Sequence, residues 1–182
     1  MTYVNESDID LLIKMFDENL GEGYMSEQEI HNYIDNEKEL FFAARREDGT
    51  ICGILLFGEE DSKTLSEQTL IPEDDLLKMA NGKKLLKCRS ICVAKDCQGS
   101  GLGRQLLSEA IQIIRKSGRY GLITSLLWEY NGKVPSLKLH EENGYQFIHR
   151  LKTPWYYLKN YKCVICKGRC QCDGLQYVLK LS

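Results

Sequence analysis

The sequence has no long hydrophobic run and no marked excess of charge of either sign. No apolar stretch in its 182 residues approaches the roughly 20 residues of a membrane-spanning helix, so we expect no membrane association. The first residues lack the basic and apolar segments of a secretory signal peptide, which predicts a cytoplasmic protein. The formal net charge is only −2, and this argues against a nucleic-acid-binding protein, whose affinity depends on phosphate neutralisation.

Internal repeats and low-complexity linkers are also missing, so we expect a single domain over residues 1–182. Hydrophobic periodicity predicts a mixed α/β order within it. The expected helices cover residues 7–20, 26–34, 102–117 and 135–143, and the expected strands cover 40–46, 51–57, 85–94, 122–128, 145–158 and 175–181. Residues 58–83 carry two acidic clusters, and we interpret them as a solvated insertion with a short helix near 72–79. A lid over an acceptor site is the alternative.

Cysteine, in contrast, is abundant: four of the eight residues lie between positions 163 and 172. Without an export signal, disulfides are the weaker interpretation. The four thiols instead match tetrahedral zinc in ligand type and number, which predicts a structural zinc site within the Cys-rich loop at 159–174. The expected ligands are Cys163, Cys166, Cys170 and Cys172. Four reduced cysteines in a surface loop are the alternative.

A glycine-rich turn joins the strand expected at 85–94 to the helix expected at 102–117. Gln98-Gly99-Ser100-Gly101-Leu102-Gly103 would present several backbone N–H groups at the positive end of a helix dipole, which suits a pyrophosphate. Arg104 could add positive charge. The spacing of the glycines fits neither a P-loop nor a dinucleotide fingerprint. A tight turn with no ligand is the alternative.

Two segments together resemble the signatures of the GNAT superfamily of N-acetyltransferases. The segment Val93–Gly103 resembles its strand-turn-helix signature, and Leu139–Tyr145 resembles its second signature, a short helix ending in Leu-Tyr-x-x-x-Gly-Phe. The resemblance extends over roughly residues 1–158. It implies an α/β (α+β) fold with a central mixed sheet, splayed into a V and flanked by helices, to which this chain adds the Cys-rich loop and a final strand.

The resemblance also implies an acyl-CoA site in the V. Backbone groups of one strand would bind the pantetheine arm and polarise the thioester carbonyl, while the turn would hold the pyrophosphate. The residues expected to bind acetyl-CoA are Ile91, Cys92, Val93, Gln98, Gly99, Ser100, Gly101, Leu102, Gly103 and Arg104.

The catalytic groups depart from the family pattern, because His140 stands where many members have the tyrosine that protonates the leaving thiolate. An imidazole can donate a proton near neutral pH, so we predict His140 as the acid and Glu129, at a strand end, as the base. Packing alone is the alternative for His140, with the proton coming from water, Tyr145 or Tyr130. An ordinary solvated carboxylate is the alternative for Glu129.

Other residues compete for these roles. Glu59 and Glu60 are rival bases, and a covalent route through Cys92 or Cys97 would need an activating base that the sequence does not reveal.

The predicted function is transfer of an acetyl group from acetyl-CoA to a primary amine of a small molecule or peptide. The alternative is a catalytically weak CoA-binding or protein-interaction module on the same fold.

Overall fold

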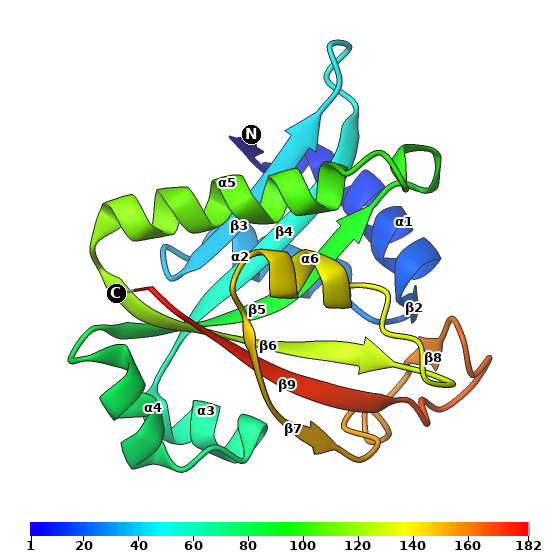
Figure 1. Cartoon of the computed structure of the whole chain (residues 1–182). Helices are drawn as coiled ribbons and strands as arrows, with labels where there is room; N and C mark the ends of the chain where they lie inside the picture. Colours follow the sequence, from blue (N-terminus) through cyan, green and yellow to red (C-terminus); the bar gives the residue numbers. More distant parts are fainter. Residues whose placement is uncertain (182) are drawn as a thin grey trace.

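A seven-stranded sheet forms the centre of the computed structural model, which describes residues 1–181 (Figure 1). In spatial order its strands are β1 (Thr2–Tyr3), β3 (Glu39–Arg45), β4 (Ile51–Glu60), β5 (Lys84–Val93), β6 (Tyr120–Glu129), β9 (Asp173–Lys180) and β7 (Gln146–Leu151). All neighbours are antiparallel except β5 and β6, which run parallel. A second, two-stranded sheet pairs β2 (Gly21–Glu22) with β8 (Lys162–Cys163).

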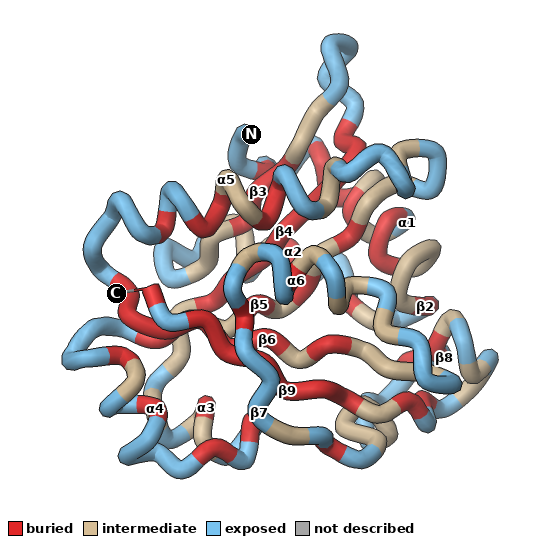
Figure 2. The backbone as a smooth tube through the Cα atoms, viewed as in Figure 1, coloured by how far each residue is buried: buried red, intermediate tan, exposed pale blue. Residues whose placement is uncertain are grey.

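Helices cover both faces of the main sheet, and the chain order gives the mixed α/β architecture that the sequence predicts. They are α1 (Ile9–Asn19), α2 (Glu27–Ile34), α3 (Ser62–Thr69), α4 (Glu73–Ala80), α5 (Leu102–Ser117) and α6 (Leu137–Glu142), with short 3-10 turns η1 (Glu6–Asp8) and η2 (Lys95–Cys97). Successive side chains of β5 point to opposite faces of the sheet. Leu86 packs with the buried stripe of α5 on one face, whereas Leu85 packs with α3 and α4 on the other. Figure 2 shows that burial is concentrated in the strands and on the inner sides of these helices. Among the described residues, no helix is long and apolar enough to cross a membrane.

Local sequence signals locate most elements within a few residues. The Ser26–Glu29 capping box opens α2, Asp48-Gly49 turns the β3–β4 hairpin, and Gly118 ends α5 with φ 67°. The start of α1 differs, because the reciprocal cap is formed by Asn5 and Asp8 rather than by Ser7 and Asp10.

The prediction of a solvated segment at 58–83 was wrong. Its first residues complete β4, and the rest forms two helices, α3 and α4, where one was expected. Leu65 and Leu76 are fully buried against the sheet, so the segment belongs to the core. The strand expected at 145–158 is also shorter, because β7 stops at Leu151 and turns follow.

The sheet splays open between its two parallel strands. Their pairing runs from Lys84 opposite Tyr120 to Cys88 opposite Ser125 and then stops. Beyond this point, β5 continues to Val93 paired only with β4, and β6 continues to Glu129 paired only with β9. A bulge at this position, where Leu56 and Phe57 face Ser90 and Cys88, turns β5 away from β6. The V-shaped sheet expected from the sequence resemblance is therefore present.

Candidate functional site

The glycine turn lies beside the splayed end of β5, between η2 and α5. Gly99 and Gly101 adopt φ values of 78° and 84°, which disfavour residues with a side chain, and Gly101 caps α5. The first N–H groups of a helix have no intrahelical acceptor, so those of Gly103 and Arg104 are directed out of the helix end. Gly103 also permits close packing, because a Cβ there would lie 3.4 Å from Val93 Cγ2. The turn thus has the backbone geometry of an anion site.

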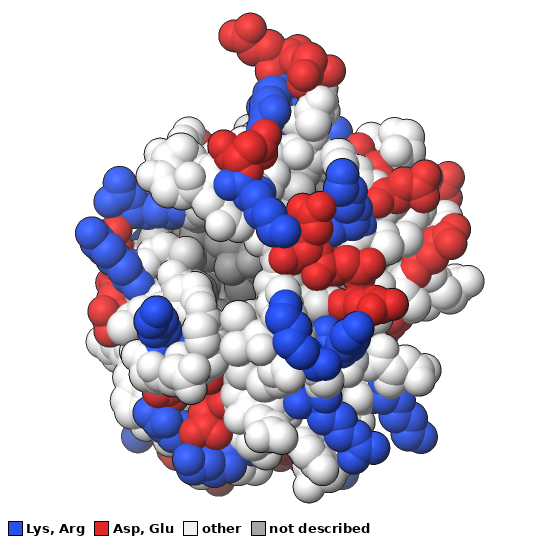
Figure 3. Space-filling view, turned by 90° about the vertical axis from the view of Figure 1, so that its right-hand side faces the viewer, with Lys and Arg blue, Asp and Glu red and all other residues white. Residues whose placement is uncertain are grey.

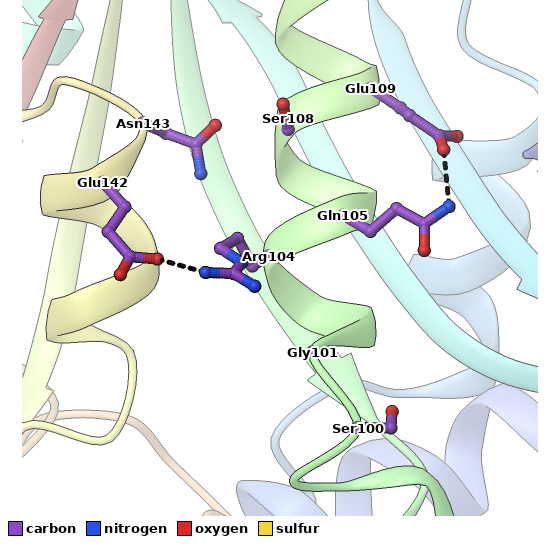
Figure 4. Close-up of a pocket in the computed structure, with 8 residues that line it drawn as sticks. All are labelled: Ser100, Gly101, Arg104, Gln105, Ser108, Glu109, Glu142 and Asn143. Carbon is purple, nitrogen blue, oxygen red and sulfur yellow. Dashed lines mark hydrogen bonds and ion pairs between the residues drawn. The ribbon is translucent and has the colours of Figure 1, made fainter.

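A surface depression of about 390 Å³ adjoins this turn and separates α5 from α6 (Figure 4). Its lining residues are Ser100, Gly101, Arg104, Gln105, Ser108, Glu109, Glu142 and Asn143. Arg104 Nη1 donates to Glu142 Oε2 at 3.0 Å across the depression. The pair is exposed and therefore weak, so the guanidinium can turn to an anion at the helix end at little cost.

Two side chains of the turn fold back onto the protein. Gln98 Nε2 donates to Asn19 Oδ1 and to the carbonyl of Val93, at 3.1 and 3.0 Å. Ser100 Oγ donates to the carbonyl of Cys97 at 2.6 Å. These bonds fix the shape of the turn.

The free edge of β5 supplies a second set of backbone groups. The N–H of Ala94 donates to the carbonyl of Cys52, and antiparallel pairing alternates from there, so the backbone of Cys92 also bonds to β4. The N–H groups of Ile91 and Val93 therefore face the opening between β5 and β6. Of the three residues expected to contact pantetheine, these two present free backbone donors there.

His140 lies at the apex of the opening and is almost fully buried. Its Nδ1–H donates to the carbonyl of Ser136 at 2.8 Å, so its Nε2 accepts from Ser125 Oγ at 2.9 Å. Burial lowers the pKa of His140 to about 4, and the imidazole is consequently neutral at pH 7.

Glu129 lies farther along β6 and is engaged in an ion pair. Its Oε2 lies 2.7 Å from Nη1 of Arg150 on β7, which also contacts Asp173 at 3.3 Å. Glu129 lies four positions after Ser125 on this strand, a distance of about 13 Å. The structure therefore does not bring Glu129 and His140 together.

The rival catalytic residues are also engaged or buried. Glu59 binds Lys84 at 2.7 Å, and Glu60 contacts Arg89 at 2.9 Å. Burial raises the pKa of the Cys92 thiol, which therefore stays protonated.

Three rivals remain: Cys97, Tyr145 and Tyr130. Tyr130 packs against Trp128 beside the cysteine cluster, with ring centroids 5.7 Å apart. Cys97 Sγ lies 2.9 Å from Arg46 Nη2 at the surface. The hydroxyl of Tyr145 is buried with no hydrogen-bond partner among residues 1–181, and burial raises its pKa.

The four C-terminal cysteines converge on one point. Their Sγ atoms all lie within 4.8 Å of one another, and those of Cys166 and Cys172 are 3.6 Å apart. A tetrahedral tetrathiolate zinc site with bonds of about 2.3 Å has sulfur separations near 3.8 Å, so this donor set fits the ion. Backbone N–H groups of Cys166 and Gln171 point at sulfurs of Cys163 and Cys166, at 3.5 and 3.3 Å. Such bonds stabilise thiolates.

Sequence reasoning missed several residues of these sites. Ser125 and Arg150 are ordinary strand residues with no local signal, and they reach their partners only through tertiary pairing. Glu142 belongs to the second signature segment, but its contact with Arg104 depends on how α5 packs against α6.

Solved structures of several N-acetyltransferases share this fold. The crystal structure of Arabidopsis thaliana NAA60 with a bisubstrate analogue aligns with a TM-score of 0.72 and 16% identity, covering 98% of this chain and 95% of that one. The ribosomal-protein-S18-alanine N-acetyltransferase of Escherichia coli aligns with a TM-score of 0.68 and 15% identity, covering 100% of this chain and 92% of that one. A mutant of the spermidine N-acetyltransferase SpeG from Vibrio cholerae aligns with a TM-score of 0.65 and 17% identity, and it also covers 100% of this chain and 92% of that one.

At the sequence level, no curated protein matches the chain. The sequence model of the acetyltransferase (GNAT) family, however, matches residues 9–145, which is well over half of the chain. The chain therefore belongs to the acetyltransferase (GNAT) family and is an acetyl-CoA-dependent acyltransferase.

Proposed function

We propose that this protein transfers the acetyl group of acetyl-CoA directly to a primary amine. The observation that carries the proposal is the opening between β5 and β6, which extends from the Cys88–Ser125 pair towards the glycine turn and is bordered by free backbone donors. In the reaction the amine nitrogen attacks the thioester carbonyl, the C–S bond breaks, and an amide forms. The amine loses a proton, and the CoA thiolate gains one.

The turn and the edge of β5 would divide the cofactor between them. Backbone N–H groups from Gly99 to Arg104 would bind the pyrophosphate, supported by the helix dipole and by Arg104. The N–H groups of Ile91 and Val93 would bind the pantetheine arm, and one of them would stabilise the negative charge that develops on the thioester oxygen.

Proton transfer is the part of the sequence prediction that the geometry modifies. An acid role for His140 requires an imidazolium, which a pKa of about 4 makes rare at pH 7. We therefore propose that His140 positions Ser125 at the apex of the opening and that water protonates the thiolate. Glu129 is held by Arg150, so we propose that the amine loses its proton to water in the opening.

The acceptor can be sought among the amines named for the structural neighbours. Two of these neighbours are named as N-acetyltransferases of spermidine and of the alanine of ribosomal protein S18. We propose release of CoA thiol as the assay, with spermidine and peptides bearing an N-terminal alanine as acceptors and with thermal shift by acetyl-CoA in parallel. Thiol release above the acceptor-free rate supports the enzyme. Stabilisation by acetyl-CoA with no release for any amine would favour the CoA-binding module instead.

We also propose that the cysteine cluster binds one structural zinc ion. The sulfur separations, the N–H groups directed at the sulfurs and the four-thiol donor set support zinc over free thiols. Metal analysis of protein purified without chelators tests this, and one zinc per chain is expected. Intact protein with clearly less metal than this would contradict the proposal.

A further inference from the structure

The cysteine cluster is attached to the connection between α1 and α2. We call residues 161–172 the cysteine knuckle. In the β2–β8 sheet, Gly21 pairs with Cys163 and Glu22 pairs with Lys162. The carbonyl of Leu20 accepts from the N–H of Val164 at 3.1 Å and from the hydroxyl of Tyr161 at 2.9 Å. The knuckle and the connection therefore form one unit, although more than 130 residues separate them in sequence.

Two glycines allow this close approach. A Cβ on Gly21 would collide with the carbonyl of Lys162 and lie 2.8 Å from the nitrogen of Val164. A Cβ on Gly23 would collide with the carbonyl of Asn160. The two backbones are thus in direct contact, and charge contributes little. Figure 3 shows acidic residues directly above a group of basic residues on this face, but the ion pair across the junction, Lys162 to Glu22, is 3.8 Å long and exposed.

The knuckle packs against β6 and is linked to β5 through Tyr24 of the connection. Tyr24 packs against Tyr161 with ring centroids 5.7 Å apart. Its hydroxyl lies 3.1 Å from Ser90 Oγ and donates to the carbonyl of Arg89 at 3.3 Å, just past the point where β5 leaves β6. On the other side, Trp128 of β6 packs against the buried cysteines, as does Trp155.

These contacts lie on the face of the sheet opposite α5. Leu86 and Cys88 of β5 and Ile123 and Leu127 of β6 pack with α5, so Trp128 points to the other face. The acyl-CoA depression is on the α5 side. The knuckle thus spans β5 and β6 behind the opening.

We infer that the metal-bound knuckle is a brace that fixes the separation of β5 and β6 and therefore the shape of the acyl-transfer site. The inference rests on the proposed zinc. Between residues 159 and 172 the only regular element is the two-residue β8, so we expect the ion to contribute much of the stability of this segment beside its contacts with the α1–α2 connection. Loss of the metal would release Tyr24 from Tyr161 and Trp128 from the knuckle, so the ends of β5 and β6, each paired on one side only, would lose this support.

The glycine turn does not depend on this brace. Its contact with α1 is made by Asn19, whose side chain is held by the carbonyl of Met15 within the helix. Loss of metal should therefore disturb the opening more than the pyrophosphate site.

The test uses hydrogen exchange and tryptophan fluorescence of the full chain with and without its metal. Both tryptophans of the sequence, Trp128 and Trp155, pack on the cluster, so the fluorescence reports on the knuckle and on its contact with β6. Metal removal should shift the emission and accelerate exchange by about tenfold or more in peptides covering 20–24, 89–93 and 126–130, while the centre of α5 keeps its protection. Adding zinc back should reverse both changes.

Matched variants separate the metal from the brace. Cys166→Ser should lower the zinc content and reproduce the metal-free exchange pattern, whereas Cys52→Ser, which replaces a buried cysteine outside the cluster, should leave zinc at one per chain. Tyr24→Phe should keep the zinc but accelerate exchange at 89–93, because it removes only the hydroxyl that contacts Ser90 and Arg89. The control Tyr157→Phe alters a hydroxyl on a side chain that is 84% exposed.

Each failure has a different meaning. Intact protein without zinc would overturn the metal proposal and the brace with it. Zinc at one per chain, with exchange at 89–93 unchanged after metal removal, would overturn the brace alone. If Cys166→Ser does not fold, metal removal from the natural chain and Tyr24→Phe still decide the question. Thiol release from acetyl-CoA tests the acetyltransferase proposal independently of all these results.

Discussion

The neutral imidazole of His140 accepts a hydrogen bond from the hydroxyl of Ser125 at the residue where β5 and β6 separate. Its other ring nitrogen is fixed by the carbonyl of Ser136, so both the tautomer and the orientation of the ring are determined. The rings of His140 and Tyr145 pack in a T-shaped arrangement with centroids 4.9 Å apart. The pair thus ties α6 to the apex of the opening and leaves neither nitrogen with a free proton to donate to a thiolate.

The buried imidazole should make folding stability depend on pH. The pKa of His140 falls from 6.5 to about 4 on folding, so the unfolded chain binds more protons in that range. Its contribution to stability is fully present above pH 6.5 and is lost as the pH falls towards 4, by about 3 kcal/mol. Denaturant unfolding at several pH values should show the free energy of unfolding falling between pH 6.5 and 4 in the natural protein, and this His140-dependent fall should be absent from His140→Gln. The control His31→Gln, at a half-exposed position on α2, should retain it. Parallel curves for the natural protein and His140→Gln would contradict the burial argument.

Turnover of His140 variants should separate positioning from acid catalysis. Loss of a general acid typically costs about 10²- to 10⁴-fold in rate, whereas we expect His140→Gln to lose less than about tenfold in kcat. The glutamine can keep a donor and an acceptor near Ser136 and Ser125, and His140→Phe, which can keep neither, should lose more. The rate of the natural enzyme should not fall as pH rises from 5 to 7. A rate that does fall there, together with a large loss in both variants, would restore the acid role.

The left-handed glycines of the turn should be sensitive to alanine for two separable reasons. Gly101→Ala places a side chain at φ 84°, which costs about 1 kcal/mol of stability and adds a methyl group beside the expected pyrophosphate. Gly49→Ala is the matched control, because it has φ 87° and open space at the hairpin tip. Both variants should lose similar stability in denaturant unfolding, but only Gly101→Ala should weaken acetyl-CoA binding, by about tenfold in calorimetry. Equal affinities in the two variants would argue against a phosphate site at this turn.

The ion pair beside the bulge of β5 should contribute more than any surface pair. Arg89 binds Glu39 through two hydrogen bonds of 2.8 and 2.9 Å, and the Glu39 side chain is only 3% exposed. Glu39→Gln leaves a buried guanidinium with reduced compensation, so we expect a loss of about 2 to 3 kcal/mol in the free energy of unfolding. Glu22→Gln, in an exposed pair, should change it by less than about 0.5 kcal/mol. Similar values for the two variants would mean that Arg89 is adequately held by Glu60 alone.

The features that the sequence predicts well are those encoded within a few adjacent residues. Capping residues, the Asp48-Gly49 turn and the apolar stripe of α5 each determine their own local geometry, so they could be located without the fold. The insertion of β9 between β6 and β7 and the bulge at Arg89 depend on strands distant in sequence, and no local pattern specifies them. The start of α1 shows the limit within local signals, because Asn5–Asp8 and Ser7–Asp10 have the same spacing and only the structure selects one.

The environment of His140 was beyond prediction for the same reason. Its position in the second signature identified it from sequence, but its pKa depends on burial and on Ser125, a residue of another element. The cysteine cluster was found from spacing alone, whereas its attachment to Leu20 and Tyr24 required the tertiary structure.

The backbone contact between β2 and β8 should make Gly21 far less tolerant of a side chain than other left-handed glycines. Gly21 has φ 132°, and a methyl group there would meet the backbone of Lys162 and Val164, which cannot move without displacing Cys163. Gly82→Ala is the control, because Gly82 has φ 73° and no atoms within 4 Å of the added carbon. Backbone strain alone costs about 1 to 2 kcal/mol, so Gly82→Ala should lose that much and Gly21→Ala more.

The decisive measurement for this pair is the rate at which a chelator removes zinc. Gly21→Ala should release its metal several-fold faster than the natural protein, since it loosens the segment that carries Cys163, and Gly82→Ala should match the natural protein. During chelation, the tryptophan emission should also shift faster in Gly21→Ala than in Gly82→Ala and the natural protein. Identical zinc release in all three proteins would show that the knuckle holds its metal without help from the α1–α2 connection, and the brace would then act in one direction only, from the metal to the sheet.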